Sequence, residues 1–243
     1  MVDRLFSEPK LAALYDAVCR GRPDFRFYLP LVMAAGAVLD VGCGTGELLR
    51  WARERGHPGR LCGLDPADAM LDVARRRSDI EWVLADARSM RFAAEFDLVV
   101  MTGHAFQVFV EDDDVGAVLA AARAALTPGG RVAFETRNPL ARAWEGWTPD
   151  NAVEVHDSSG HLVRLTHEVV AREGERVSFT STFTSPGWEL SEVSQTTLRF
   201  TDADSVSRLL CDAGLVIEEQ FGDWDRSSLG AASPEIITIA RLR

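Results

Sequence analysis

The sequence predicts an α/β protein built on a doubly wound, largely parallel sheet, with an antiparallel β insertion late in the chain. Between residues 36 and 136, short apolar runs alternate with stretches of helical periodicity, which is typical of parallel strands covered by helices on both faces. Residues 137–200 break this alternation, because Val, Thr and Phe recur there with a period of two between turn signals. A helical stretch and two apolar runs follow in residues 201–243, so we expect the chain to return to the first sheet.

Each predicted element has its own local signal. Strands are expected where short apolar runs occur, at 37–42, 60–65, 80–86, 96–101 and 131–136. Helices are expected where apolar residues recur at helical spacing, at 47–56, 67–77 and 115–126. A helix at 203–214, closed by Gly214, and strands at 215–221 and 235–241 complete the chain.

The insertion and the N-terminal segment fall outside this alternation. Residues 137–200 are expected to form about four antiparallel strands, with turns at Ser158-Ser159-Gly160, Glu173-Gly174 and Pro186-Gly187. Residues 7–34 are expected to form one or two amphipathic helices, with one face made by Leu11, Leu14, Tyr15 and Val18. These helices either cover an opening or simply pack against the sheet.

Composition and charge narrow the classes of partner. The 243 residues include 26 Lys and Arg against 37 Asp and Glu, so the formal net charge is −11 with His neutral. Nucleic-acid binding depends largely on basic side chains, so we expect no nucleic-acid partner. No apolar stretch is long enough to cross a membrane, and the first residues lack a signal-peptide pattern, so we expect a cytoplasmic protein.

The cysteines and histidines give no sign of disulfides or metal. The four cysteines have no C-x-x-C spacing and lie in apolar surroundings, at positions Cys19, Cys43, Cys62 and Cys211. This pattern indicates reduced, buried thiols. The histidines show neither H-E-x-x-H nor zinc-finger spacing, so no metal site is expected.

A glycine-rich loop is the most informative motif. The apolar strand at 37–42 runs into Gly42, Gly44 and Gly46 and then directly into a helix, which makes a tight turn where a ligand approaches the backbone closely. Free N–H groups at the helix start favour an anionic ligand group. Glu47 stands where a dinucleotide-binding fingerprint has Gly or Ala, and its carboxylate would repel a pyrophosphate.

Two aspartates follow the next two strands. Asp65 ends the second strand, where an acidic side chain reaches ribose hydroxyls, and Asp86 ends the third, where a carboxylate and the next amide can bind adenine. Either one alone is explained by helix capping or a turn. Together with the glycine loop, they lie at the carboxyl ends of successive parallel strands, which is the ligand crevice of open α/β sheets.

With these residues in place, the chain resembles the class I S-adenosylmethionine-dependent methyltransferases that act on small molecules. The resemblance covers residues 36–136 and the terminal strands. It includes the D-x-G-x-G-x-G motif at 40–46, the pair Asp86-Ala87 and the segment LTPGG before the fifth strand. It implies a Rossmann-like sheet of strand order 3-2-1-4-5-7-6 with strand 7 antiparallel. It also implies S-adenosylmethionine as cofactor and a small-molecule methyl acceptor as partner.

The resemblance assigns roles to individual residues. The glycine loop would hold the methionine part of the cofactor, with Asp40 orienting its amino group. Asp65 would bind the ribose, and Asp86 with the Ala87 amide would bind the adenine. The side chains expected to pack against the nucleoside are Met70 and Met101. Tyr15 lies in a Tyr-Asp segment like the one whose tyrosine meets the cofactor carboxylate in small-molecule members.

The resemblance also indicates the acceptor side. His104 follows the fourth strand, where this family places substrate-facing residues, and an imidazole suits a general base at neutral pH. A structural histidine bonded to backbone is the alternative. The expected domains are a helical cap (1–35), a cofactor-binding core (36–136 and 201–243) and an insertion that covers the substrate (137–200). The acceptor atom stays open between amine, hydroxyl and carboxylate.

Two other functions are weighed against methyl transfer. A nicotinamide-dependent oxidoreductase also has a glycine turn after strand one, but Glu47 and the Asp86-Ala87 pair argue against it. A non-catalytic S-adenosylmethionine-binding scaffold or sensor would need the same loop and acids, so the sequence does not exclude it.

Overall fold

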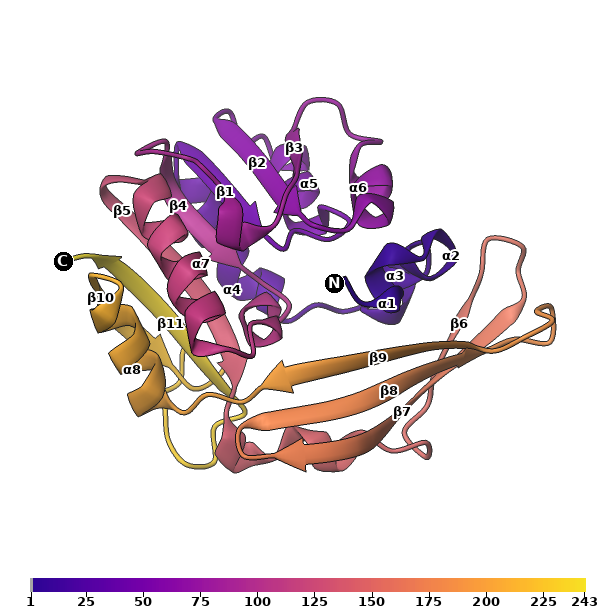
Figure 1. Ribbon diagram of the computed structural model, residues 1–243. Helices are drawn as coiled ribbons and strands as arrows, with labels where there is room; N and C mark the ends of the chain where they lie inside the picture. The colour runs from indigo at the N-terminus through magenta and orange to yellow at the C-terminus, as the bar shows by residue number, and fades with distance from the viewer. Residues whose placement is uncertain (1) are drawn as a thin grey trace.

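A seven-stranded sheet organises the chain, of which the computed structural model describes residues 2–243. Its strand order is β10-β11-β5-β4-β1-β2-β3 (Figure 1). The strands are β1 (Ala37–Val41), β2 (Arg60–Asp65), β3 (Glu81–Leu84), β4 (Phe96–Met101), β5 (Leu126–Arg137), β10 (Leu215–Phe221) and β11 (Glu235–Leu242). All pairs are parallel except those of β11, which is antiparallel to both neighbours. Counted within this sheet, the order is 3-2-1-4-5-7-6, which confirms the prediction.

Helices cover both faces of this sheet because apolar side chains alternate along its strands. On β4, Leu98 and Val100 belong to the core beneath one face, whereas Val99 and Met101 belong to the core beneath the other. The first face is covered by α4 (Asp24–Ala34) and α5 (Glu47–Glu54), and the second by α7 (Asp112–Ala125) and α8 (Ala203–Asp212). The short helix α6 (Asp68–Ala74) packs beside β2 and β3.

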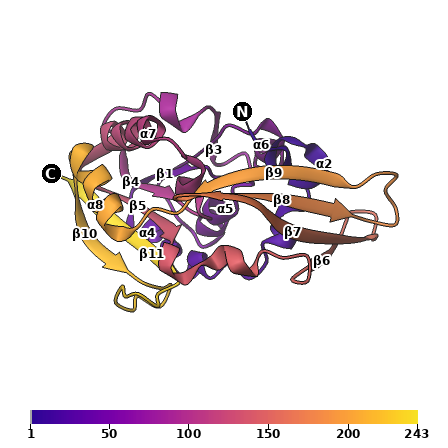
Figure 2. The ribbon, with the colours of Figure 1, turned by 60° about the horizontal axis from the view of Figure 1, so that its bottom comes forward.

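The insertion forms a separate four-stranded antiparallel sheet, as predicted. Its order is β6-β7-β8-β9, made of β6 (Val153–His156), β7 (Leu162–Glu173), β8 (Arg176–Thr184) and β9 (Glu192–Arg199). Two 3-10 turns, η3 (Pro139–Ala141) and η4 (Ala143–Gly146), connect it to β5. Figures 1 and 2 show it as a long twisted ribbon that extends away from the core.

The N-terminal segment differs from its prediction. Instead of one or two helices over 7–34, it forms α1 (Arg4–Ser7), α2 (Pro9–Ala12), α3 (Tyr15–Val18) and the longer α4. Glu8 has extended backbone angles just before Pro9, which separates α1 from α2. Gly21 adopts a left-handed φ of +78° before Pro23, so α4 begins as a new helix.

The short helices face two partners at once, which a single helical stripe would not allow. Leu11 and Leu14 pack with Val163 and Phe183 of the insertion. Ala12 and Tyr15 pack instead in a cluster that includes residues of α6. The segment is therefore wedged between the core and the insertion sheet, as its position in Figure 1 also shows.

Two smaller predictions are corrected. Cys43 and Cys62 are buried, but Cys19 is only half-buried and Cys211 is exposed, because α8 turns the latter away from the sheet. The fifth strand, predicted at 131–136, begins earlier, at Leu126. Residues 127–130 bulge out of it, because Phe96 pairs with Leu126 whereas Leu98 pairs with Arg131. The described helices include none long and apolar enough to cross a membrane.

Two glycines give opposite predictions for stability. A Cβ added at Gly63 of β2 would lie 2.5 Å from the Trp82 ring and 2.8 Å from the Cys43 sulfur, so Gly63→Ala should destabilise the fold by about 1–3 kcal/mol. Gly116 is exposed inside α7 with nothing within 4 Å of such a Cβ, so Gly116→Ala should stabilise it by about 1 kcal/mol. Urea denaturation of both variants measures the difference; equal effects would contradict the packing at Trp82.

Candidate functional site

The glycine loop follows β1 and leaves room for a ligand at only one of its three glycines. Gly42, Gly44 and Gly46 all have left-handed φ angles, of +75°, +55° and +73°. A Cβ would lie 2.9 Å from the Ala105 side chain at Gly42 and 2.2 Å from the Trp82 ring at Gly46. At Gly44 the nearest atom would be in the Tyr15 ring, 3.9 Å away. Packing therefore requires glycine at 42 and 46, whereas Gly44 presents open backbone.

Asp65 holds this loop against the end of β2. Its carboxylate accepts the backbone N–H of Gly44 at 2.8 Å and that of Ala67 at 2.8 Å. The residue is 7% exposed, and burial raises the pKa of its carboxyl while the two backbone bonds lower it. Each carboxylate oxygen has a second lone pair, so Asp65 can still accept hydrogen bonds from ligand hydroxyls.

Asp86 lies at the neighbouring strand end in a different environment. It caps the short helix η1 (Ala87–Ser89) by accepting the Arg88 N–H at 2.9 Å, and it also pairs with the Arg88 guanidinium. This guanidinium holds the pKa of Asp86 below its usual range and bonds Asp114 at 3.0 Å. Ala87 is buried at 6% exposure. The carboxylate is thus ionised and half-exposed at the edge of the site.

Asp40 is buried within the strand end without a full set of partners. It is 1% exposed, and its Oδ1 has no hydrogen-bond partner among the described residues. Burial raises the pKa of its carboxyl to about 7. The cation that lowers the pKa of Asp40 is Arg22, whose guanidinium bonds Asp24 and packs against Gly103. Sequence reasoning missed Arg22, because it stands in an irregular segment before α4 with no motif around it.

The remaining predicted cofactor residues are more enclosed. Tyr15 faces Gly44 and contacts Phe6 edge to face, with ring centroids 6.0 Å apart. Met70 is 1% exposed and packs with the N-terminal segment. Met101 is fully buried in the core on the α7 face of the sheet. Their roles at a nucleoside stay predictions.

His104 is the best-anchored residue of the predicted acceptor side. It has a left-handed φ of +64°, and its N–H donates to Glu135 Oε1 at 2.6 Å. Glu135, fully buried on β5, also accepts the Tyr28 hydroxyl. The ring Nε2 lies 3.0 Å from a carboxylate oxygen of Glu235. Burial lowers the pKa of the His104 ring to about 3, so the ring is neutral.

The charges of this region are unbalanced. Every buried carboxylate among residues 2–243 belongs to the set Asp24, Asp40, Asp65, Glu135 and Glu235. Their pKa shifts show that they act on one another: Asp24, Asp65 and Glu135 all raise the pKa of Asp40, and Asp24 raises that of Glu235. The cations close to them are Arg22 and Arg137. The carboxyl end of the sheet therefore holds more acidic than basic groups, and a cation placed there would favour their ionised forms. A charged residue inside the apolar strand RVAFETR was the one sequence signal for Glu135.

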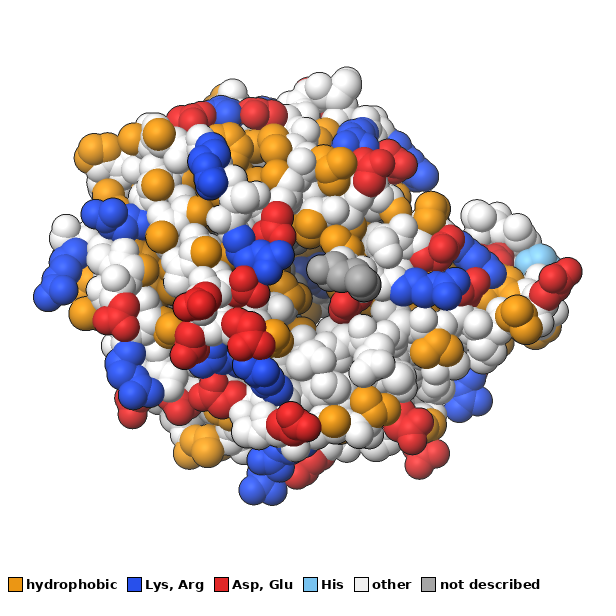
Figure 3. Space-filling model, in the orientation of Figure 1, with side chains coloured by type: hydrophobic (Ala, Val, Ile, Leu, Met, Phe, Trp, Pro, Cys, Tyr) orange, Lys and Arg blue, Asp and Glu red, His pale blue; other side chains and the backbone are white. Residues whose placement is uncertain are grey.

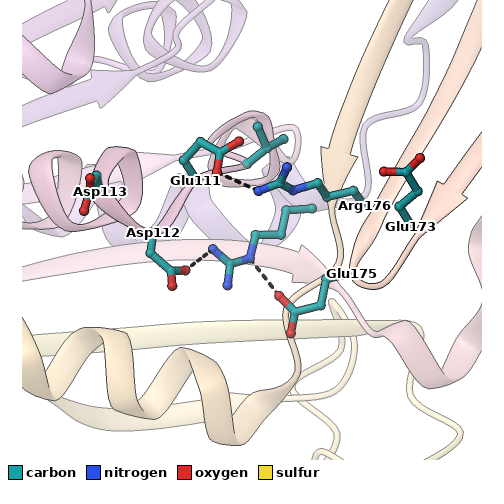
Figure 4. A pocket seen from close by; sticks show the side chains of 8 residues that line it. Glu111, Asp112, Asp113, Glu173, Glu175 and Arg176 are labelled. Atoms are coloured by element: carbon teal, nitrogen blue, oxygen red, sulfur yellow. Dashed lines mark hydrogen bonds and ion pairs between the residues drawn. The ribbon is translucent and has the colours of Figure 1, made fainter.

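Two well-defined pockets lie elsewhere. The larger, about 400 Å³, is lined by acidic residues of the α7 start and the β7–β8 turn together with Arg176 and Arg199. Arg176 pairs with Glu111 at 2.6 Å (Figure 4), and Arg199 pairs with Asp112 and Glu175, so this pocket is an ion-pair surface. The second, about 330 Å³, includes Trp144 and Phe200. Neither contains a glycine-loop residue. Figure 3 shows a hollow where core, insertion and N-terminal helices meet.

Metal coordination has no support in the described chain. No cluster of three or more His, Cys, Asp or Glu side chains in residues 2–243 has a spacing suited to an ion.

Comparison with known proteins identifies the family. A model described as "Methyltransferase domain" matches residues 38–130. A 2-phytyl-1,4-naphtoquinone methyltransferase of Thermosynechococcus vestitus is 40% identical over 112 residues, covering 44% of this chain and 48% of the relative. The match with the first two curated relatives thus spans about half of their length.

Two further relatives match over most of their length. A ubiquinone biosynthesis O-methyltransferase of a Methylobacterium species is 32% identical over 195 residues, covering 68% of this chain and 75% of the relative. A dTDP-4-amino-2,3,4,6-tetradeoxy-D-glucose N,N-dimethyltransferase of Saccharopolyspora spinosa is 26% identical, covering 86% of this chain and 87% of the relative.

A solved structure shares the fold over nearly the whole chain. The CcbJ methyltransferase from Streptomyces caelestis superposes with a TM-score of 0.76 at 20% identity, covering 98% of both chains. Insertion and N-terminal helices are included in that coverage. The chain belongs to the class I S-adenosylmethionine-dependent methyltransferases.

Proposed function

We propose that this chain transfers the methyl group of S-adenosylmethionine to an amine of a small molecule. The observation that supports an amine is the excess of buried carboxylates over arginines at the carboxyl end of the sheet. A protonated amine and a sulfonium are both cationic, so both are attracted to this region. The aminosugar dimethyltransferase that matches 86% of the chain supports the same acceptor class.

The residues present fit the cofactor. The unpartnered Oδ1 of buried Asp40 is available for the amino group of the methionine part, and Arg22 lies close enough to act on its pKa. The backbone at Gly44 is open to a close approach. Asp65 retains acceptor capacity for ribose hydroxyls, and Asp86 with the Ala87 amide remains the proposed adenine site.

The chain's contribution to the reaction is chiefly placement. When bound, S-adenosylmethionine supplies an electrophilic methyl group on a positively charged sulfur. The protein must hold the acceptor nitrogen in line with that methyl and exclude water, which accounts for most of the expected acceleration. The N-terminal segment supports this, because Thr45 of the glycine loop bonds Asp16 at 2.5 Å and Leu5 bonds Ser194 of the insertion at 2.9 Å.

The insertion is proposed to cover the acceptor. Beside Arg137 it contributes aromatic surface, with the Trp147 ring 5.4 Å from the guanidinium and 4.5 Å from the Phe179 ring. Gln107 ties the two parts together, since it accepts from Arg137 at 2.8 Å and donates to the Arg199 carbonyl at 2.8 Å. An apolar wall with few polar groups is typical of small-molecule sites.

Turnover with matched acceptors tests the function. The protein is incubated with S-adenosylmethionine and pairs of amino and hydroxy sugars, free and linked to dTDP, and products are detected by mass spectrometry. We expect methylation of amines only. Methylation of hydroxyls alone would overturn the amine assignment and favour an oxygen acceptor, as named for the Methylobacterium relative. Binding of the cofactor without any turnover would favour a scaffold or sensor.

Gly44→Val should abolish cofactor binding with a modest loss of stability. The new side chain occupies the open backbone face of the loop, and the left-handed φ adds strain. Gly129→Val is the matched control, because Gly129 has a φ of +87°, nothing within 4 Å of a Cβ, and lies in the β5 bulge. Calorimetry with S-adenosylhomocysteine measures both. Equal affinities in the two variants would show that Gly44 does not contact the cofactor.

Asp40→Asn should stabilise the ligand-free fold and at the same time weaken cofactor binding. Because burial raises the folded pKa of Asp40 to about 7, the folded state holds a proton that the unfolded state has lost, and its stability falls as pH rises from about 4 to about 7. The stability advantage of the variant over the parent should therefore be smaller at pH 5 than at pH 8. At pH 8 the ligand-free variant should melt several degrees higher, at about 2–4 °C per kcal/mol.

The same variant should bind S-adenosylhomocysteine at least about tenfold more weakly, since it loses the anionic partner of the amino group. Thermal melts at the two pH values, with and without S-adenosylhomocysteine, provide both measurements. A melting difference that is the same at pH 5 and pH 8 would contradict the buried, uncompensated carboxylate.

A further inference from the structure

We propose that Glu235 is the positioning residue of His104: it accepts the Nε2–H of the ring and thereby turns the lone pair of Nδ1 toward the acceptor amine. This inference rests on the proposed function and deepens it, because it names the pair that would take the proton from a protonated amine. Nothing in the sequence motifs pointed to Glu235, which is the first residue of the last strand.

The geometry joins two distant parts of the chain. Glu235 begins β11 and stands opposite Arg137, the last residue of β5, in the strand register. Its backbone N–H donates to the Gly222 carbonyl at 3.1 Å, which fixes the strand start. Both of its carboxylate oxygens reach His104 Nε2, at 3.0 and 3.1 Å. The Glu235 side chain is 11% exposed and the His104 side chain is 17% exposed, so both are largely shielded from water but still reachable by a ligand.

The carboxylate sets the tautomer of the ring. An ionised carboxylate only accepts hydrogen bonds. Above the pKa of Glu235, which burial raises to about 7, Nε2 must therefore carry the hydrogen and Nδ1 the lone pair. Among residues 2–243, no other group hydrogen-bonds to the ring. Nδ1 is therefore the nitrogen left free to accept a proton from a ligand.

The backbone of His104 is anchored separately from its ring. Its left-handed φ is held by the N–H bond to Glu135, which is itself bonded to Tyr28. A strained backbone angle in a non-glycine residue at a strand end is typical of functional sites. Glu135 thus places the Cα of His104, and Glu235 orients the imidazole.

The proton transfer balances within the site. A proton leaves the acceptor ammonium for Nδ1, the ring becomes imidazolium, and the amine keeps its lone pair for the methyl group. Because burial lowers the pKa of the ring to about 3 in the ligand-free protein, this transfer requires the negative charge of Glu235 beside Nε2. The Nε2–H stays on the ring and remains donated to Glu235, so the imidazolium forms next to a carboxylate. The charged groups that act on the pair are Arg22 before α4, Asp24 at the start of α4, Glu135 and Arg137 on β5, and Asp223 in the loop before β11.

Nitrogen-15 NMR of the histidine ring tests the tautomer without any acceptor. In the full-length protein with S-adenosylhomocysteine at pH 7.5, we expect a hydrogen on Nε2 and none on Nδ1, with His104→Ala identifying the signals. Glu235→Gln should keep this tautomer, because the amide oxygen still accepts. Glu235→Leu should lose it. Glu219→Gln, an exposed glutamate of β10, is the matched control and should change nothing.

The outcomes separate this inference from the proposed function. A ring with its hydrogen on Nδ1 in the parent protein, or an unchanged tautomer in Glu235→Leu, overturns the role of Glu235. Failure of the parent to bind S-adenosylhomocysteine in calorimetry overturns the proposed function instead. With an amine from the acceptor panel, Glu235→Leu should lower kcat by about 10²-fold while KM and the Kd of S-adenosylhomocysteine change less than about twofold. An equal loss of kcat and of S-adenosylhomocysteine affinity would indicate a merely structural role.

Discussion

The burial of carboxylates at the carboxyl end of the sheet is the constraint on which the rest of the structure depends. Asp40, Glu135 and Glu235 are each less than 9% exposed, and an ionised carboxylate away from water is costly unless it has partners. Each has a partner from a different part of the chain: Arg22 of the N-terminal segment acts on Asp40, Tyr28 of α4 bonds Glu135, and His104 after β4 bonds Glu235. The carboxyl end of the sheet is thus a set of desolvated acidic groups with few basic partners.

Packing on two surfaces at once explains why the N-terminal segment is broken into short helices. A single helix would present one apolar stripe to one surface. Leu11 packs instead on the insertion, whereas Tyr15 lies over Gly44 of the glycine loop. The segment links both parts through polar bonds as well, since Thr196 of β9 donates to Asp3 at 2.6 Å. The N-terminal segment therefore contacts both the core and the insertion.

Local sequence signals account for the sheet and for the cofactor half of the site. Alternation of apolar runs with helical periodicity placed each strand of the core within a few residues, and Gly44, Asp65 and Asp86 follow strand ends that are neighbours in any parallel sheet. The acceptor half carries no such signal. Arg22, Arg137 and Glu235 are separated by 98 residues or more in the chain, and only the pairing of β11 with β5 brings the last two together.

The sequence by itself determined the α/β class and the glycine loop, because these depend on residues close together in the chain. Tertiary structure alone decided that His104 bonds Glu235 and that Asp40 lacks a partner for one oxygen. It also decided that Gly46 makes room for the Trp82 ring while the backbone at Gly44 stays open. Burial and the contacts of residues far apart in the chain are properties of the packed molecule, and these properties set both the charge of the site and the direction of its side chains.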